Sequence, residues 1–201
     1  MSVLTLRPGK NNKVHLLLDG EYTMTADSDF VAFSGLHDNM ILDDEALTDL
    51  QGKVNARRAF NKASDLLAMR DHSEKELLQK LRQKGFADGA EEAIEKLKGY
   101  GYLDDSRFAL RFAQELQRLK HYGKKRIEQE LLRKGVSREI VGDTLEQLSF
   151  DEDALTALIE RKYRRQLDTE KGVQKTVAAL QRMGYSFGEI RDALQKLQED
   201  V

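Results

Sequence analysis

The chain has 201 residues, of which 40% are hydrophobic and 34% charged, with a formal net charge of −2. This balance is typical of a folded, highly solvated helical protein and excludes a disordered one. The absence of cysteine excludes a disulfide scaffold, a thiolate metal site and a cysteine nucleophile. No apolar run approaches the roughly 18 residues of a membrane span, and the first residues lack the apolar core of a signal peptide, so we expect a cytoplasmic protein without membrane contact.

Residues 1–42 predict a small β-hairpin extension. Val14, Leu16 and Leu18 alternate along one strand, Asp19-Gly20 is a strong two-residue turn, and residues 22–25 can return as the partner strand. Because a lone hairpin is marginal in water, we expect it to pack on the helices that follow. Residues 27–39 show no clear pattern. The region is acidic, since residues 14–52 contain nine Asp or Glu and no Lys or Arg.

Residues 43–103 predict a first unit of three helices. Asp43 and Asp44 are expected to cap a long helix, in which Gly52 is a candidate interruption. A second helix runs from Ser73 to Gly85 and a third passes through Leu97. The long helix carries an apolar stripe made of Leu47, Leu50, Val54, Phe60, Ala63 and Leu67.

Residues 104–149 predict a second unit built on the same plan. Asp104 and Asp105 provide carboxylates for a helix start. Apolar residues then recur in steps of four, four and three, which keeps them on one helical face. Gly123 ends that helix or caps the next, which closes at Gly135. The apolar positions of the two helices are Phe108, Phe112, Leu116, Leu119, Ile127 and Leu131.

Three glycines mark a repeat of about 50 residues. Gly85, Gly135 and Gly184 are 50 and 49 residues apart, and a leucine precedes each by four positions. Twelve positions before each lies a residue suited to a helix start: Ser73, Gly123 and Gly172. Residues 150–201 therefore form the third unit, in which Ser186 and Glu189 match a capping box, as Ser73 and Glu76 do in the first. The sequence predicts a mainly α fold, a tandem array of three three-helix repeats.

No pattern of catalytic or cofactor-binding residues is present. The four histidines, His15, His37, His72 and His121, lack the pairing on one helix face that a zinc site needs. The paired aspartates are better explained as helix caps than as acid and base. The sequence contains neither a phosphate-binding glycine loop with its lysine nor a serine elbow. We therefore expect no enzyme activity, no metal and no cofactor.

Basic residues gather in the second and third units. Residues 107–138 contain ten basic and three acidic residues. A single exposed charge is best explained as solvated surface, but an excess this local is repulsive and favours an anionic partner. Tyr100 and Tyr102 are candidates for base stacking, whereas helical spacing makes Phe108 and Phe112 core residues. The candidate partner-binding or DNA-binding residues are Arg107, Arg111, Lys124, Lys125, Arg126, Arg133, Lys134, Arg138, Arg161, Lys162, Arg164, Arg165, Lys171 and Lys175.

Three segments resemble the RecX family of regulatory proteins, which modulate the bacterial recombinase RecA. They are SEKELLQKLRQKGF at residues 73–86, GYLDDSRFA at residues 101–109 and KKRIEQELLRKGV at residues 124–136. The second is the most specific. Asp71-His72 departs from the family, in which many members have proline before the helix. The structural motif residues are Ser73, Gly85, Asp104, Asp105, Phe108, Gly123, Gly135 and Gly184.

The resemblance implies three three-helix repeats in a curved, elongated rod and a monomer that binds RecA and its nucleoprotein filament in the helical groove. It further implies inhibition of ATP hydrolysis, filament extension and strand exchange, with weak direct DNA contact. Two alternatives stay open. A helical-repeat DNA-binding protein without a RecA role predicts tight, salt-sensitive binding to bare DNA, and a general interaction scaffold predicts indifference to both.

Overall fold

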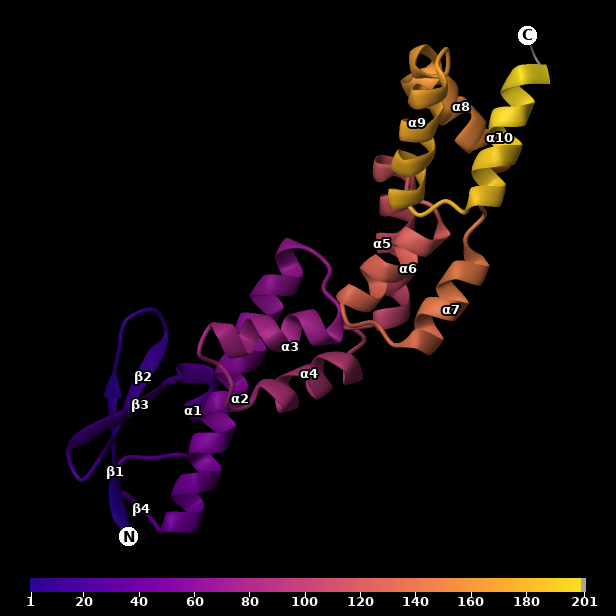
Figure 1. Cartoon of the computed structure of the whole chain (residues 1–201). Coiled ribbons are helices and arrows are strands. Elements are labelled where there is room, and N and C mark those ends of the chain that lie inside the picture. The colour runs from indigo at the N-terminus through magenta and orange to yellow at the C-terminus, as the bar shows by residue number, and fades with distance from the viewer. Residues whose placement is uncertain (200–201) are drawn as a thin grey trace. The chain divides into compact units, whose positions relative to one another are not determined.

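The computed structural model describes residues 1–199, and their contacts divide the chain into two compact units. The first unit contains Met1–His72 and Glu76–Leu103. The second contains Ser73–Lys75 and the chain from Asp104 onward. Figure 1 shows the elements of both units, coloured in chain order.

The first unit begins with a four-stranded antiparallel sheet in the order β3-β2-β1-β4. The predicted hairpin is confirmed as the pair β2 and β3 at one edge of this sheet, with Asp19 and Gly20 both at positive φ. The two further strands were not predicted, because β1 and β4 pair through residues nearly forty positions apart. The bounds are β1 Ser2–Pro8, β2 Lys13–Leu18, β3 Glu21–Asp27 and β4 Met40–Leu42.

One face of this sheet packs against helix α1, Ser28–Phe33, and the first half of helix α2, Asp44–Met69 (Figure 1). The Asp43 carboxylate caps α2 by accepting from the Ala46 amide at 2.8 Å, as predicted. The expected interruption at Gly52 is wrong, since α2 continues through it. A single glycine costs a helix only about 1 kcal/mol, which the packing of α2 on both sides of it outweighs.

The first three-helix domain is completed by α3, Glu74–Gln83, and α4, Ala90–Gly99. Their apolar faces close on the second half of α2, with Leu77, Leu81 and Leu97 fully buried. Gly85 follows α3 at φ +81°, a left-handed conformation that strains residues with a side chain.

The second three-helix domain contains α5, Asp105–Lys120, α6, Lys124–Arg133, and α7, Arg138–Gln147. Ile127 and Leu131 are fully buried at its centre, and Phe108 is buried as predicted. Leu119 is 52% exposed, which corrects its assignment to the apolar face. It lies in the last turn of α5, where Leu116 already fills the core.

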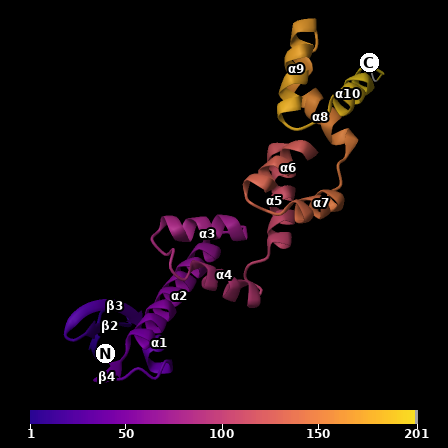
Figure 2. The same cartoon turned by 60° about the horizontal axis from the view of Figure 1, so that its bottom comes forward.

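The third three-helix domain contains α8, Glu152–Tyr163, a 3₁₀ turn at Arg164–Gln166, α9, Glu170–Arg182, and α10, Phe187–Glu199 (Figure 2). The capping box is confirmed, since Ser186 and Glu189 exchange bonds of 2.6 and 3.2 Å. The placement of the α9 start at Gly172 is wrong, because Thr169 caps this helix and accepts from the Gly172 amide at 3.1 Å.

The predicted fold class is confirmed, with one hydrophobic cluster for each three-helix domain and one for the sheet. Gly135 and Gly184 follow α6 and α9 at φ +86° and +95°, like Gly85 after α3. Among the helices of residues 1–199, none is both long and apolar enough to cross a bilayer.

Candidate partner-binding surface

The basic candidates lie on separate elements of the second unit. Most are exposed, and they fall into one group on the second three-helix domain and one on the third. In the second domain the exposed members include Arg107 and Arg111 on α5, Lys124 and Lys125 in the first turn of α6, and Arg138 at the start of α7. In the third domain they are Arg161, Lys162, Arg164, Arg165, Lys171 and Lys175.

Two of the predicted basic residues form ion pairs with one buried carboxylate. Arg126 pairs with Glu130 at 2.9 Å, and Arg133 pairs with the other oxygen of the same group. The Glu130 side chain is only 8% exposed, and the Arg126 guanidinium also lies 5.5 Å from the centre of the Tyr122 ring. Removing either cation would leave a buried charge less compensated. Arg126 and Arg133 therefore hold α6 together as well as presenting charge.

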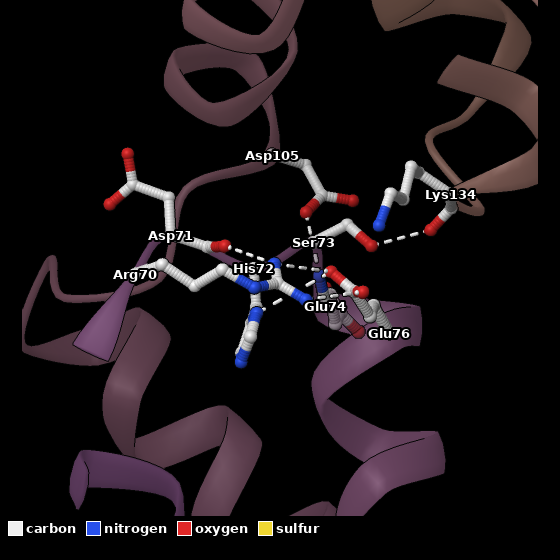
Figure 3. A network of polar contacts seen from close by, with 8 residues as sticks. All are labelled: Arg70, Asp71, His72, Ser73, Glu74, Glu76, Asp105 and Lys134. Carbon is white, nitrogen blue, oxygen red and sulfur yellow. Dashed lines mark hydrogen bonds and ion pairs between the residues drawn. The ribbon is translucent and has the colours of Figure 1, made fainter. Parts of the chain in front are cut away.

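Lys134 is also tied to its own domain. Its ammonium lies 5.6 Å from the centre of the Phe112 ring, and its main-chain carbonyl accepts from the Ser73 hydroxyl (Figure 3). Ser73 is fully buried, so this bond is shielded from water. The contact explains why residues at the start of α3 group with the second unit.

The two aspartates of the GYLDD segment cap two different helices. Asp104 accepts from the Arg107 amide at 2.9 Å and caps α5, as predicted. Asp105 instead accepts from the Glu74 amide at 2.8 Å, at the start of α3 (Figure 3). The pair thus fixes the start of α3 against the start of α5. No local pattern could reveal the second cap, because its partner lies 31 residues away.

The same close-up contains an ion cluster of the first unit. The Arg70 guanidinium donates to both oxygens of Glu76, at 3.0 and 2.8 Å (Figure 3). The Nδ1 atom of the buried His72 lies 3.4 Å from the same carboxylate. This cluster lies in the turn before α3.

The second and third domains meet through main-chain atoms. The Gly123 amide donates to the Met183 carbonyl at 2.8 Å, and the Lys125 amide donates to the Gly184 carbonyl at 3.3 Å. A Cβ atom on Gly123 would lie 2.8 Å from the Gly184 carbonyl, and one on Gly184 would lie 2.3 Å from the Arg126 amide nitrogen. The start of α6 and the end of α9 therefore approach as closely as two glycines allow.

This contact brings a histidine of one domain to the basic run of the next. His121 follows α5 in the left-handed conformation, φ +53°, and its Nε2 atom lies 3.1 Å from an Arg161 guanidinium nitrogen. The Tyr185 hydroxyl donates to the His121 carbonyl at 3.0 Å. Burial lowers the pKa of His121, and the charges of Lys162 and Arg161 lower it further. Burial also raises the pKa of Tyr185, with a further contribution from Glu189.

His121 and Tyr185 were not among the predicted surface residues. Arg161 lies forty positions from His121 in sequence, so neither periodicity nor spacing could pair them. Within residues 1–199, no group of three or more His, Cys, Asp or Glu side chains is arranged to hold a metal ion. The surface offers cations and hydrogen-bond donors, which can bind an anionic partner but do not form a catalytic constellation.

The fold and this surface define a class: a tandem three-helix-repeat protein with basic faces on neighbouring repeats. Three family models match the chain, namely the first RecX three-helix domain at residues 59–97, the second at 104–145 and the third at 151–194. The chain belongs to the RecX family of regulatory proteins. This agrees with the expectation that it is not an enzyme.

Relatives and solved structures agree with this membership. The regulatory protein RecX of Bacillus licheniformis is 31% identical over 194 residues, which cover 93% of this chain and 74% of that protein. The regulatory protein RecX of Caldanaerobacter subterraneus is 30% identical, with 92% and 93% covered. A crystal structure of a regulatory protein RecX matches with a TM-score of 0.69 at 20% identity, covering 96% of this chain and all of that one. At that identity it supports the fold.

Proposed function

We propose that this chain binds RecA and its nucleoprotein filament in the helical groove and thereby limits ATP hydrolysis, filament extension and strand exchange. Membership of the RecX family is the observation that carries the proposal. The action requires no chemistry of its own, because a protein bound across neighbouring protomers can block their movement or their growth.

The charge distribution supports a filament as the partner. The exposed cations of the second and third domains suit a surface that carries DNA, because each phosphate contact releases condensed counterions. Lys124 and Lys125 project from a helix start whose backbone is already fixed by the Gly184 turn. Arg164 and Arg165 lie on the 3₁₀ turn beyond α8. Rigid presentation reduces the entropy lost on binding.

The experiment measures the single-stranded-DNA-dependent ATPase rate of the cognate RecA while this protein is added, first below and then at a one-to-one ratio to RecA. We expect inhibition below one-to-one and only weak binding to naked DNA. Full ATPase activity together with tight, salt-sensitive binding to naked DNA would instead establish the helical-repeat DNA-binding function. Full activity without DNA binding would favour a scaffold for another partner.

A charge-reversal variant tests the surface. Reversal of four cations of the third domain should abolish inhibition while the far-ultraviolet circular dichroism stays native. Reversal of four cations of the first unit removes the same formal charge and should leave inhibition intact. Equal inhibition by both variants would contradict the assignment. The test set is Arg161, Lys162, Arg164 and Arg165, and the control set is Arg7, Lys10, Lys62 and Lys84.

A further inference from the structure

Two nitrogen-bearing side chains are in contact where the second and third domains meet, and a third lies near them. His121 ends α5, and Arg161 and Lys162 lie in the last turn of α8. The Arg161 guanidinium nitrogen lies 3.1 Å from His121 Nε2, and Lys162 is close enough for its charge to act on the imidazole. Arg161 and Lys162 are both exposed, so the group faces solvent.

The main chain of His121 is anchored on both sides of the residue. The His121 amide donates to the Gln117 carbonyl at 3.1 Å, and its carbonyl accepts from the Tyr185 hydroxyl at 3.0 Å. Two residues later, the Gly123 amide is fixed on the Met183 carbonyl. The main chain that carries the ring is therefore anchored at the contact between the domains.

The contact with Arg161 specifies the protonation state of the ring. A guanidinium is always charged and only donates, so His121 Nε2 must accept and the proton of the neutral imidazole resides on Nδ1. In the described part of the chain, no carboxylate pairs with Arg161 or Lys162. Arg161 thus contacts, and the charge of Lys162 acts on, a neutral ring that would become a third cation on protonation.

The other charged groups near the ring include both acidic and basic side chains, and several of them form hydrogen bonds or ion pairs of their own. A cavity of about 470 Å³ beside His121 separates α5 from α8 and α10. Glu189 accepts from the Ser186 amide, and Lys196 pairs with Asp153 at 3.2 Å. The charged groups lining the cavity with His121 are Arg118, Asp151, Glu189, Asp192 and Lys196. None of these acids pairs with the two cations of α8.

We propose that His121, Arg161 and Lys162 form an oxyanion notch that receives a backbone phosphate of single-stranded DNA and binds it more tightly as the pH falls. The two non-bridging oxygens of a phosphodiester can accept charge-assisted hydrogen bonds from donors that come from two elements. The inference deepens the proposed function and rests on it for the source of the phosphate, the DNA of the filament.

The pH dependence follows from linkage. Without an anion, burial and the two cations keep the pKa of His121 below its usual value near 6.5, and the ring is neutral at pH 7.5. A bound anion, either the monoanionic phosphodiester of DNA or the sulfate dianion, favours the imidazolium and raises that pKa. Binding therefore takes up a proton and strengthens as the pH falls through the range in which the free ring titrates.

The test is an NMR titration of the histidine side chains with sodium sulfate, which remains a dianion between pH 5.5 and 8, at constant ionic strength. We expect sulfate to move the His121 midpoint to higher pH and to leave the exposed His37 unchanged. A short oligothymidylate should produce the same displacement. The variant R161Q/K162Q should bind sulfate at least about tenfold more weakly, because two charge-assisted hydrogen bonds are lost. The matched control K171Q/K175Q, with the same charge removed from α9, should behave like the native chain.

Each outcome bears on the proposal. A His121 midpoint that neither sulfate nor the oligonucleotide moves would overturn it, as would a displacement by polyglutamate but not by the oligonucleotide. The variant His121→Asn keeps a residue that tolerates the left-handed conformation and should remove the pH dependence of oligonucleotide binding. If this variant inhibits the RecA ATPase with an unchanged pH profile, the notch is wrong while the proposed function stands. Loss of inhibition by the native chain itself would instead contradict the proposed function.

Discussion

The two units attach their elements by different means. In the first unit the hairpin is fastened to α2 by the Asp27 carboxylate, which pairs with Lys13 and accepts from the Asn61 amide at 2.6 Å. In the second unit the third domain is fastened to the second through main-chain amides and carbonyls at Gly123 and Gly184. One attachment depends on an ionised side chain and the other on the absence of side chains, so different perturbations should weaken each.

The largest expected effect comes from Gly184→Ala. The new Cβ atom would lie 2.3 Å from the Arg126 amide nitrogen at a residue with φ +95°, so strain and collision add. We expect the free energy of unfolding of the second unit to fall by about 3 kcal/mol or more. Urea denaturation, with hydrogen exchange to locate the change, measures it.

Two matched substitutions distinguish the cost of backbone strain at positive φ from the cost of a steric clash with the new Cβ atom. Gly85→Ala has nearly the same φ but no atom within 4 Å of the new Cβ, and should cost about 1–2 kcal/mol. Gly142→Ala also has free space, lies within α7, and should stabilise by about 0.5–1 kcal/mol. If Gly184→Ala and Gly85→Ala lowered the free energy of unfolding equally, the close approach of α6 and α9 would add nothing to the cost of the Gly184 substitution.

A smaller effect is expected from Ser73→Ala, which removes a buried hydroxyl bond to the Lys134 carbonyl. Leaving this carbonyl without its donor should lower the free energy of unfolding by about 1–3 kcal/mol. Ser137→Ala is the control, since that hydroxyl caps α7 at an exposed position and is worth about 1 kcal/mol or less. If the Ser73→Ala protein were as stable as the native chain, groups other than this hydroxyl would stabilise the start of α3.

We expect the stability of the first unit to fall at acidic pH. Burial raises the pKa of Asp27, but hydrogen bonds from Lys13 and Asn61 and the charges of Lys13 and Arg57 lower it by more, so the net pKa is below its usual value. Its stabilisation is therefore complete above the unfolded pKa of about 3.9 and is lost as the pH falls through the lower folded value.

We expect Asp27→Asn to cost about 1–2 kcal/mol at pH 6 and to make the stability of the first unit less dependent on pH below about 4. Asp29→Asn, at an exposed neighbouring position, should retain the native pH profile. Urea denaturation between pH 6 and 3 checks this. A native-like profile for Asp27→Asn would mean that other carboxylates set the acid sensitivity.

The smallest effect on stability is expected from K124Q/K125Q. Both side chains are exposed in the first turn of α6, where cations are slightly unfavourable, so the free energy of unfolding should change by no more than about 0.5 kcal/mol. Affinity for the RecA filament should nevertheless fall, in a filament-pelleting assay at low salt. A large loss of stability would show that these lysines hold the turn together rather than meet a partner.

The sequence by itself determined the features that depend on near neighbours. The three-helix repeat, the caps at Asp43, Asp104 and Ser186, and the left-handed glycines all follow from contacts within about four residues or from the helical period. The engagement of Arg126 by Glu130 belongs to this group, since four residues separate them on one helix, and the spacing could have revealed it.

Only the tertiary structure decided the contacts that join distant segments. The strands β1 and β4, the cap that Asp105 provides for α3, and the meeting of His121 with Arg161 each pair residues that are more than thirty positions apart. Nothing in a local pattern encodes such a pair, because which faces meet depends on how closely the backbones pack. At Gly123 and Gly184 that packing depends on two missing side chains, and it brings His121 of one domain to Arg161 of the next.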